Sequence, residues 1–328
     1  MKKHILVLHD MVGAQAPPDE QDTLVQVAQV ESALRRAGYD VSLEAFNGDL
    51  TDLSQVLKTH QFDLVFNLVE TYYGSRFLHT IPLLCEQLGI RVTGGNSHSL
   101  FLSGDKVLAK KLMRLAGIPT PDWIDPHSPS TWESFIGKTL ICKPRGEDAS
   151  VGIDDASVFT CQSFVELKKR MKEAEYRNML LERYIEGAEY NVSISSVNGI
   201  PKIHPIAEIV FKSYPEGKPR IVGYEAKWLE DSFAYSHTVR SFAFSDENQE
   251  VDLRLRQVVE TCWQLFDCTG YARVDLRCDD MGNPFVLELN MNPCLSQDSG
   301  FIAACAQEGL SYDQTIVQIA REAMHGTA

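Results

Sequence analysis

Along the first hundred residues, short apolar runs alternate with longer segments whose apolar side chains recur three and four positions apart. The runs at residues 4–8 and 63–69 are typical of buried strands in a parallel sheet. Residues 23–37 have the helical spacing and are followed by Gly38, which predicts a helix that ends at a glycine. Because strands and helices alternate, we expect an α/β domain with a doubly wound parallel sheet over residues 1–103. Further strands are expected at 40–43 and 90–93, and further helices at 52–59 and 80–88.

The pattern changes after residue 103, where one strongly helical segment carries Lys106. Strands are then predicted at residues 140–143 and 178–185, with a helix at 162–174 between them. Residues 200–240 alternate as in an antiparallel sheet, a long helix follows at 246–266, and two helices close the chain. We therefore expect two further α+β domains, which cover residues 104–189 and 190–328.

Residues 270–293 have the alternating pattern of a two-strand hairpin. With a turn centred on residues 281–282, Asp275 lies directly opposite Glu288. Like charges in such positions destabilise a ladder, so we expect a cation between the two carboxylates. The amide oxygen of Asn290 follows on the same face. Hard oxygen ligands of this kind suit Mg²⁺ that holds the phosphates of a nucleotide.

A simpler interpretation of the same hairpin needs no metal. Arg273 and Arg277 share the face of the two acids. In this alternative the arginines neutralise the carboxylates, and the face is an ordinary solvated surface.

The segment around Lys143 is a second candidate for nucleotide binding. A predicted strand ends at this lysine, and a glycine-containing loop follows before residues 150–152 enter the next strand. Such a loop can direct backbone N–H groups at phosphate oxygens, with Lys143 as the positive charge. An ordinary surface hairpin is the alternative. The nearby Gly137-Lys-Thr139 is not a Walker A motif, because Trp132 stands where that motif requires glycine.

Acidic residues near the predicted strand ends are candidate ligand contacts, because open α/β sheets bind ligands beyond the carboxyl ends of their strands. Glu70 ends one apolar strand, and Glu20 and Asp22 lie in the loop after another. Glu182 and Glu189 flank a glycine-containing turn, where a carboxylate can accept a hydrogen bond from an adenine amine or a ribose hydroxyl. Solvated surface charge is the alternative for each of them.

Composition and charge exclude several classes of protein. The 328 residues carry a net charge of −14, which repels nucleic acid and anionic membrane surfaces. No apolar run approaches the roughly 20 residues of a membrane span, and no signal-peptide pattern follows Met1, so we expect a cytoplasmic protein. The eight cysteines include no Cys-x-x-Cys pair, which predicts reduced and mostly buried thiols. The nine histidines are dispersed, which argues against a transition-metal site.

The order of these motifs resembles the ATP-grasp superfamily and, within it, the D-alanine–D-alanine ligase family, over nearly the whole chain. The matching pieces are Val65-Phe-Asn-Leu, Asp105-Lys106, Lys143-Pro, Ser150-Val-Gly, the segment from Glu182 to Glu189, Tyr224-Glu-Ala-Lys227, Ala272-Arg-Val-Asp275, Leu287-Glu-Leu-Asn290 and Asn292-Pro293. Their shared order and spacing carry the resemblance. It implies a three-domain ATP-grasp fold of the α/β and α+β classes, in which the central lid domain and the C-terminal domain clamp ATP.

The resemblance also implies roles for individual residues. For ATP they are Lys106 and Lys143 at the phosphates, Glu182 with the Tyr184 and Ile185 backbone at adenine, Glu189 at the ribose and Lys227 on a closing loop. The metal ligands are Asp275, Glu288 and Asn290, which bind two Mg²⁺ ions, with Mn²⁺ as an alternative. Arg273 stabilises an oxyanion, and Ser150 and Ser299 line the substrate site.

Four departures from the family pattern surround the expected substrate site. Residues 11–22 replace the glycine-rich first loop and its amine-binding glutamate, which leaves that role to Glu20 or Asp22. The other three are Glu70 for a histidine, Trp228 for a tyrosine that would bridge to Ser150, and Cys294 for a glycine of the oxyanion hole. An added anion at Glu70 favours a cationic or amine-bearing acceptor.

The resemblance therefore implies an ATP-dependent carboxylate–amine ligase for small-molecule substrates such as amino acids, not necessarily D-alanine at both positions. It forms a dipeptide or similar amide through an acyl phosphate and releases ADP and phosphate. A homodimer is also implied. Two alternatives remain, a small-molecule kinase whose product keeps the phosphate, and a nucleotide-binding regulator without turnover.

Overall fold

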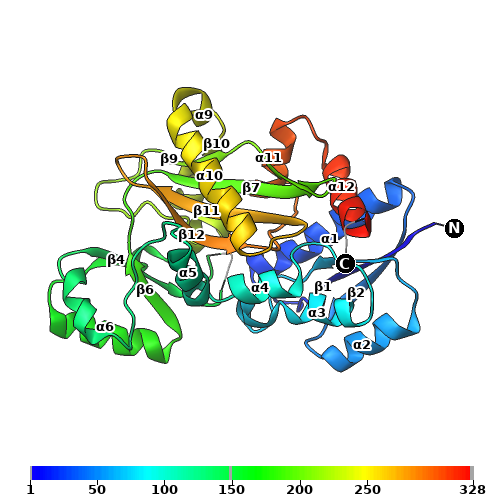
Figure 1. Ribbon diagram of the computed structural model, residues 1–328, viewed down its shortest axis with the longest axis horizontal. Helices are drawn as coiled ribbons and strands as arrows, with labels where there is room; N and C mark the ends of the chain where they lie inside the picture. The colour runs from blue at the N-terminus through cyan, green and yellow to red at the C-terminus, as the bar shows by residue number, and fades with distance from the viewer. Residues whose placement is uncertain (1, 148–149, 326–328) are drawn as a thin grey trace.

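The computed structural model describes residues 2–147 and 150–325. Its N-terminal sheet contains β1 (His4–Asp10), β2 (Asp40–Phe46) and β3 (Leu64–Leu68), all parallel, in the order β2-β1-β3 (Figure 1). The helices of this region are α1 (Pro18–Arg36), α2 (Leu50–Thr59), α3 (Thr80–Gln87) and α4 (Ser97–Ser103), with the short helix η1 (Gly74–Phe77). The strand predicted at 90–93 is reduced to a single bridge between Val65 and Val92, because the chain turns at Gly94 with a φ of +87°.

Helices cover both faces of this sheet, as predicted for a doubly wound arrangement. On one face Ile5 and Phe66 pack with α1 and with the C-terminal helix α12 (Tyr312–His325). On the other face Leu6 and Val65 pack toward α2, α3 and α5 (Lys106–Leu115). Successive side chains of a strand point to opposite faces, so one buried run such as residues 5–8 supplies both cores.

A small antiparallel sheet follows, with β4 (Thr139–Pro144) between β5 (Val158–Thr160) and β6 (Met179–Arg183). It has its own core with α6 (Phe164–Tyr176) and the helix η2 (Pro129–Phe135), built from residues such as Leu140 and Leu167. The prediction that residues 150–152 enter a strand is wrong. Ser150 has a φ of +64°, which no strand allows, and β5 begins only after the short helix η3 (Asp155–Ser157). Residues 148 and 149 of the predicted glycine-containing loop lie outside the described residues.

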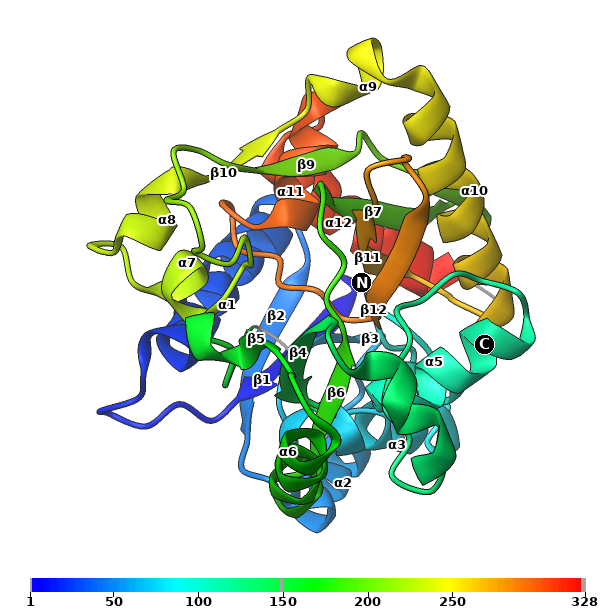
Figure 2. The ribbon, with the colours of Figure 1, turned by 90° about the vertical axis from the view of Figure 1, so that its left-hand side faces the viewer.

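The third sheet is antiparallel and has the order β10-β9-β7-β11-β12, with β8 paired to β7. Its strands are β7 (Glu189–Val197), β8 (Ile200–Ile203), β9 (Ala207–Phe211), β10 (Thr238–Ser241), β11 (Tyr271–Cys278) and β12 (Pro284–Asn290). Between β9 and β10 the chain forms α7 (Tyr224–Trp228) and α8 (Phe233–His237), and after β12 it forms α11 (Gly300–Gln307). Figure 2 shows α7 and α8 to one side of this sheet, with β4 and β6 below it.

The helix predicted at 246–266 is two helices, α9 (Phe244–Glu247) and α10 (Gln249–Leu265). They separate at Asn248, whose φ of −133° and ψ of 59° are not helical. Leu255 and Val259 of α10 lie in one hydrophobic cluster with Val192 of β7 and Val274 of β11, and this cluster also contains Leu6 and Val65 of the N-terminal sheet. The C-terminal sheet and the N-terminal sheet therefore share a continuous hydrophobic core.

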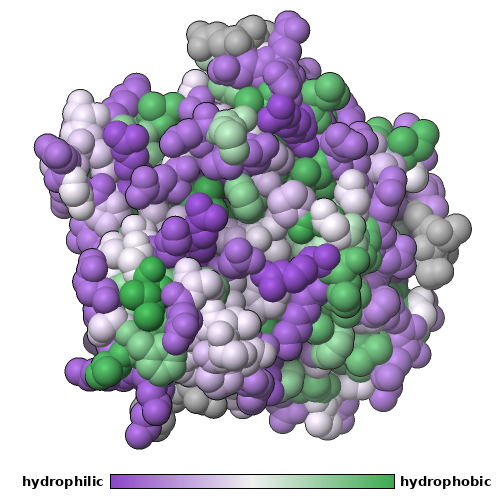
Figure 3. All heavy atoms as spheres, turned by 60° about the vertical axis from the view of Figure 1, so that its left-hand side comes forward, coloured by the Kyte–Doolittle hydropathy of each residue, from purple (hydrophilic) through white to green (hydrophobic). Residues whose placement is uncertain are grey.

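The described helices include none with the length and apolarity of a membrane span. All eight cysteines are free thiols, and six of them are buried, as predicted from their spacing. On the face drawn in Figure 3, hydrophilic residues are widespread and hydrophobic residues lie between them in small groups.

Candidate active site

The hairpin of β11 and β12 places Asp275 opposite Glu288, which confirms the predicted pairing. Arg273 pairs with Asn290 farther along the same ladder. A β-bulge follows Asp275 and gives β12 one extra residue, so the turn is not centred on residues 281–282 as predicted. Bulges of this kind are common next to active sites, where they change the direction of a side chain.

A cation neutralises each of the two facing carboxylates. Arg273 Nε and Nη2 lie 2.7 and 2.8 Å from the two oxygens of Asp275, and Asn191 Nδ2 donates to Asp275 Oδ1 at 2.8 Å. Lys106 Nζ lies 3.2 Å from Glu288 Oε2. Burial alone would raise the pKa of Glu288, but the nearby cations, Lys106 first among them, hold that pKa well below its usual range. Glu288 is therefore ionised and able to bind a metal cation.

Glu182 on β6 is buried between two lysines. Its Oε1 lies 2.6 Å from Lys143 Nζ on β4, and its Oε2 lies 2.6 Å from Lys110 Nζ on α5. Burial tends to raise the pKa of Glu182, but the two ammonium groups outweigh it and lower that pKa. Burial also lowers the pKa of Lys110 to about 8. Lys110 was not predicted as a site residue, although it lies four residues after Lys106 and thus on the same helix face.

Arg277 binds the residue expected at the ribose. Its Nη2 and Nε lie 2.8 and 3.0 Å from Glu189 Oε2, and its Nη1 donates to the carbonyl oxygen of Ile185 at 2.9 Å. Its guanidinium also lies over the ring of Tyr184, 4.7 Å from the centroid. The alternative in which Arg277 neutralises the hairpin acids is wrong for this residue, because β11 and β7 pair Arg277 directly with Glu189. Burial raises the pKa of Glu189, and Arg277 opposes that shift.

Residues 212–237, which we call the covering segment, lie over these groups. The segment makes hydrogen bonds to residues of the N-terminal, central and C-terminal parts of the chain. Ser150 Oγ donates to the carbonyl oxygen of Val222 at 2.6 Å. Tyr224 Oη donates to Asp19 Oδ1 at 2.7 Å, which ties the segment to the first turn of α1. The prediction that Glu20 and Asp22 lie in a loop is wrong, because α1 already begins at Pro18. Lys227 Nζ lies 4.9 Å from the ring centroid of Trp228. The segment is therefore closed over the site in this structure.

The predicted substrate-site acids have different surroundings. Asp22 faces Cys294, whose Sγ donates to Asp22 Oδ2 at 3.3 Å, and burial raises the pKa of Asp22. Glu70 accepts a hydrogen bond from Gln26 Nε2 at 2.7 Å, and burial raises its pKa as well. Gln26 in turn accepts from the backbone N–H of Leu295 at 2.6 Å. Glu70 is thus held through Gln26 to the loop after β12.

These groups surround one cavity of about 330 Å³ between the small antiparallel sheet and the C-terminal sheet. The predicted residues that line it are Asp22, Lys143, Ser150, Glu182, Tyr184, Ile185, Glu189, Lys227, Trp228, Arg273, Asp275, Glu288, Cys294 and Ser299. Lys106, Asn290, Glu70 and exposed Glu20 are not among the lining residues, although Lys106 contacts Glu288. Asn290 Oδ1 accepts from the backbone N–H of Asn292 at 2.9 Å.

Several lining residues had not been predicted as ligand contacts, among them the polar residues Asn191, Arg240 and Asp298. Strand alternation provides the signal for two of them. Asn191 lies two positions after Glu189 on β7, and Arg240 lies two positions after Thr238 on β10, so each shares a face with a residue that also lines the cavity.

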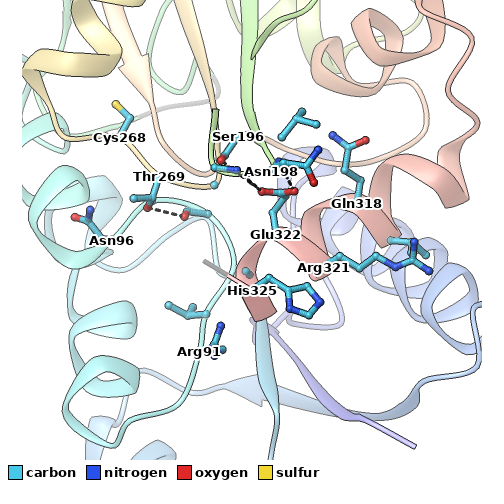
Figure 4. Close-up of a pocket in the computed structure, with 18 of the residues that line it drawn as sticks. Arg91, Asn96, Ser196, Asn198, Cys268, Thr269, Gln318, Arg321, Glu322 and His325 are labelled. Carbon is cyan, nitrogen blue, oxygen red and sulfur yellow. Dashed lines mark hydrogen bonds between the residues drawn. The ribbon is translucent and has the colours of Figure 1, made fainter. Parts of the chain in front are cut away.

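A second cavity of about 1860 Å³ lies beside α12 and contains no predicted site residue (Figure 4). It shares no lining residue with the first cavity. Its polar groups pair with one another. Glu322 accepts from the backbone N–H groups of Asn198 and Gly199 at 2.7 and 3.3 Å, and Thr269 Oγ1 donates to the carbonyl oxygen of Gly94 at 3.4 Å. Most of the predicted site residues thus line the first cavity and none lines the second.

Comparison with known proteins agrees with this geometry. Residues 112–321 match the family model described as D-ala D-ala ligase C-terminus. An uncharacterized protein, y4sG of Sinorhizobium fredii, is 31% identical over 88% of this chain and 84% of its own length. The D-alanine–D-alanine ligase of Haemophilus influenzae is 28% identical over 80% of this chain and 84% of its own length.

Solved structures show the same fold. The D-alanine–D-alanine ligase of Bacillus anthracis superimposes with a TM-score of 0.75 at 23% identity, over 99% of this chain and 98% of the other. Its complex with ATP gives 0.74 at 22% identity, over 98% and 97% of the two chains. The chain thus has the ATP-grasp fold.

The chain belongs to the D-alanine–D-alanine ligase family of the ATP-grasp superfamily. It is an ATP-dependent ligase that joins a carboxylate to an amine of small-molecule substrates, and it uses ATP and Mg²⁺. The kinase and the non-catalytic regulator are not favoured.

Proposed function

We propose that the cavity on the β11–β12 hairpin is the site of ligation and that the product is a dipeptide or similar amide. The observation that carries this proposal is the facing pair Asp275 and Glu288 in the same cavity as Lys143 and Arg273. Carboxylates for a metal, a lysine for phosphate and an arginine for an oxyanion are the groups that acyl-phosphate chemistry needs.

Nucleotide binding is assigned to the end of the cavity near β4 and β6. Lys106 and Lys143 bind the phosphates, and the backbone of Tyr184 and Ile185 holds adenine. Glu182 also binds the adenine, Glu189 binds the ribose, and Lys227 of the covering segment binds the phosphates. The positions of Lys143, Glu182 and Glu189 around one cavity support this assignment.

The hairpin residues fit the metal that the family uses. Asp275 and Glu288 supply carboxylate oxygens in register, and Asn290 supplies an amide oxygen two residues after Glu288. Oxygen ligands of this kind are those that Mg²⁺ and Mn²⁺ prefer. Bound there, two such ions would neutralise charge on the phosphates of ATP. Arg273 and Lys106, which pair with the carboxylates in this structure, would share them with the metal.

The reaction then proceeds in two steps. An oxygen of the first substrate's carboxylate attacks the γ-phosphorus of ATP, ADP leaves, and an acyl phosphate forms. The amine nitrogen of the second substrate attacks the acyl carbon, and the tetrahedral oxyanion faces Arg273 and the backbone N–H of Cys294. Collapse of this intermediate expels phosphate and leaves the amide.

The covering segment keeps water from the acyl phosphate. It is held by the hydrogen bonds of Ser150 to Val222 and of Tyr224 to Asp19. Both bonds join the segment to residues outside it, so closure links the first turn of α1, the central domain and the C-terminal sheet. We assign residues 1–103, 104–189 and 190–328 as the three domains that close in this way.

Substrate recognition is assigned to the opposite end of the cavity. Asp22 lines the cavity and Glu20 does not, which favours Asp22 for the substrate ammonium group. Ser150, Ser299, Trp228 and Cys294 complete the site, and Glu70 supports it through Gln26. The relatives are named for D-alanine, and we propose an amino acid of that type at one of the two positions.

We also infer a cytoplasmic protein that binds neither nucleic acid nor membranes, because its net charge is −14. A homodimer is the assembly that the family resemblance supports.

The proposal is tested by incubating the purified chain with ATP, Mg²⁺ and D- and L-amino acids, singly and in pairs. We expect ADP release that depends on a pair, with a product whose mass equals both substrates less one water. A stable phosphorylated amino acid, or ATP binding without ADP release under any pair, would refute it.

A further inference from the structure

Arg240 is a cation of the cavity that the family resemblance leaves without a role. It lies on β10, the edge strand of the C-terminal sheet, and its side chain lines the substrate end of the cavity together with that of Thr238. Figure 2 shows β10 beside α11. An edge strand beside a cavity can present a side chain to a ligand without disturbing the sheet core.

The guanidinium of Arg240 lies at the first turn of α11. A Cβ atom built on Gly300 would lie 3.6 Å from Arg240 Nη2 and 3.9 Å from both Arg240 Nε and Arg273 Cδ. Two arginine side chains therefore converge on Gly300, the first residue of α11 after the N-cap Ser299. Arg240 Nη1 donates to the carbonyl oxygen of Asp298 at 3.3 Å, which holds the side chain in this position.

Arg240 differs from Arg273 and Arg277 of the cavity, because each of those two forms an ion pair with a carboxylate. Arg273 pairs with both oxygens of Asp275, and Arg277 pairs with Glu189. Among the described residues no carboxylate oxygen lies within ion-pair distance of Arg240. Partial desolvation in the cavity and repulsion from Arg273 lower the pKa of Arg240, and the Asp298 carboxylate only partly offsets them. An anion beside Arg240 would therefore be stabilised.

Two neighbouring groups at this end of the cavity can each hold a carboxylate. One is the first turn of α11, which begins at the N-cap Ser299 and whose free backbone N–H groups can donate to an anion. The other is the fork of Arg240, which presents parallel N–H donors in the geometry that matches a carboxylate. A substrate amino acid with a single carboxylate needs only one of them.

We propose that Arg240 is a specificity-determining residue that binds a second, side-chain carboxylate of the amine-bearing substrate, so that this substrate is a dicarboxylic amino acid. The inference rests on the proposed function for the identity of the cavity, and it adds the chemical class of the acceptor. The first turn of α11 holds the α-carboxylate, Arg240 holds the side-chain carboxylate, and the α-amine is left to attack the acyl carbon. The reaction and its products are otherwise unchanged.

The decisive comparison is between acids and their amide isosteres. Aspartate is compared with asparagine, and glutamate with glutamine, in both stereochemistries, by kcat/KM for ADP release with mass identification of the amide. Loss of a charge-assisted hydrogen bond corresponds to a preference of roughly 10- to 100-fold for the acid over its amide. We expect this ratio in the wild-type chain and a ratio near one in Arg240→Gln, with Arg240→Lys between them.

Arg35→Gln is the matched control, because Arg35 lies on α1, pairs with Glu31 and does not line the cavity. It should keep the wild-type ratio. Asp298→Asn removes the neighbouring negative charge and should increase the ratio. A wild-type ratio near one, or the same ratio in Arg240→Gln as in the wild type, would overturn the proposal.

A binding measurement separates this inference from the proposed function. Calorimetry with a non-hydrolysable ATP analogue and Mg²⁺ reports the Kd of each acid and its amide without turnover. If the wild type binds the acid more tightly than the amide and Arg240→Gln does not, the role of Arg240 is supported even when no product amide is formed. In that case the proposed function alone fails. Equal Kd values for acid and amide refute the role of Arg240 even if ligation is observed.

Discussion

Arg277 holds Glu189 by two hydrogen bonds to one carboxylate oxygen, at 2.8 and 3.0 Å, and both residues are buried. The same guanidinium donates to the Ile185 carbonyl oxygen, so it joins β7, β11 and the segment after β6. Arg277 occupies Oε2 of Glu189, so the ribose hydroxyl of the proposed function would bind the other oxygen. We therefore propose that Arg277 is a positioning residue for the nucleotide.

Replacing this arginine should therefore affect both stability and nucleotide affinity. Arg277→Met leaves Glu189 buried without its partner, which costs about 3–5 kcal/mol of unfolding free energy. We expect KM for ATP to rise roughly 10-fold or more, with a smaller change in kcat, because the ribose contact loses its orientation. Urea unfolding and steady-state kinetics measure the two effects.

The double variant Glu189→Gln/Arg277→Met distinguishes these effects. It removes both charges, so it should recover much of the lost stability while KM for ATP stays high. If Arg277→Met unfolds at the wild-type urea concentration and keeps the wild-type KM, the positioning role is wrong.

Removing the charge of either facing carboxylate, Asp275 or Glu288, should lower activity by weakening Mg²⁺ binding. Asp275→Asn and Glu288→Gln each remove one anionic ligand, so we expect kcat/KM to fall about 100-fold or more. The Mg²⁺ concentration for half-maximal activity should also rise in any variant active enough to titrate. Asp280→Asn, at an exposed position in the hairpin turn, is the control and should behave as the wild type. Full activity of Asp275→Asn at the same Mg²⁺ concentration would contradict the metal assignment.

Asp10, at the end of β1, predicts a dependence of stability on pH. Burial raises the pKa of Asp10 to about 7, although its Oδ2 accepts from the backbone N–H of Glu70 at 2.8 Å. Between its ordinary pKa of 3.8 and about 7 the folded chain binds a proton that the unfolded chain releases. The contribution of Asp10 to stability is therefore lost as pH rises through this range.

Asp10→Asn removes this titration and keeps the hydrogen-bond acceptor. The variant should be more stable than the wild type at pH 8 and show a smaller decrease in unfolding free energy between pH 5 and pH 8. Asp63→Asn is the opposite control, because Lys3 and the backbone N–H of His4 lower the pKa of Asp63, and this variant should lose stability at pH 8. Equal pH profiles of Asp10→Asn and the wild type would exclude the assignment.

The coupling of ATP hydrolysis to amide formation should depend on the hydrogen bond from Tyr224 to Asp19. Tyr224→Phe removes the hydrogen bond between the covering segment and the first turn of α1, so water should reach the acyl phosphate more often. We expect more ADP released per amide formed, measured as the ratio of the two products. Tyr72→Phe removes a hydroxyl that donates to Gly48 within the N-terminal region, and it should leave the ratio unchanged. An unchanged ratio in Tyr224→Phe would show that this bond does not protect the acyl phosphate from hydrolysis.

Local patterns in the sequence were sufficient for most of the elements. Apolar runs, helical spacing and glycine stops predicted β1, β3, α1 and the β11–β12 hairpin, because hydrophobic periodicity is a property of a few neighbouring residues. The pairing of Asp275 with Glu288 followed from alternation and an estimate of the turn. The bulge after Asp275 did not, since nothing in the local pattern marks an extra residue.

What the sequence alone determined is the set of chemical groups and their order along the chain, which identified the family through its spaced motifs. What the tertiary structure decided is which groups meet. Lys110 shares Glu182 with Lys143, Arg277 binds Glu189, and Arg240 reaches the first turn of α11. These partners are separated by 39 or more positions and lie on different elements, so their contacts depend on how the sheets pack. Pairing energies of buried charges depend on such contacts, and a linear pattern carries no information about them.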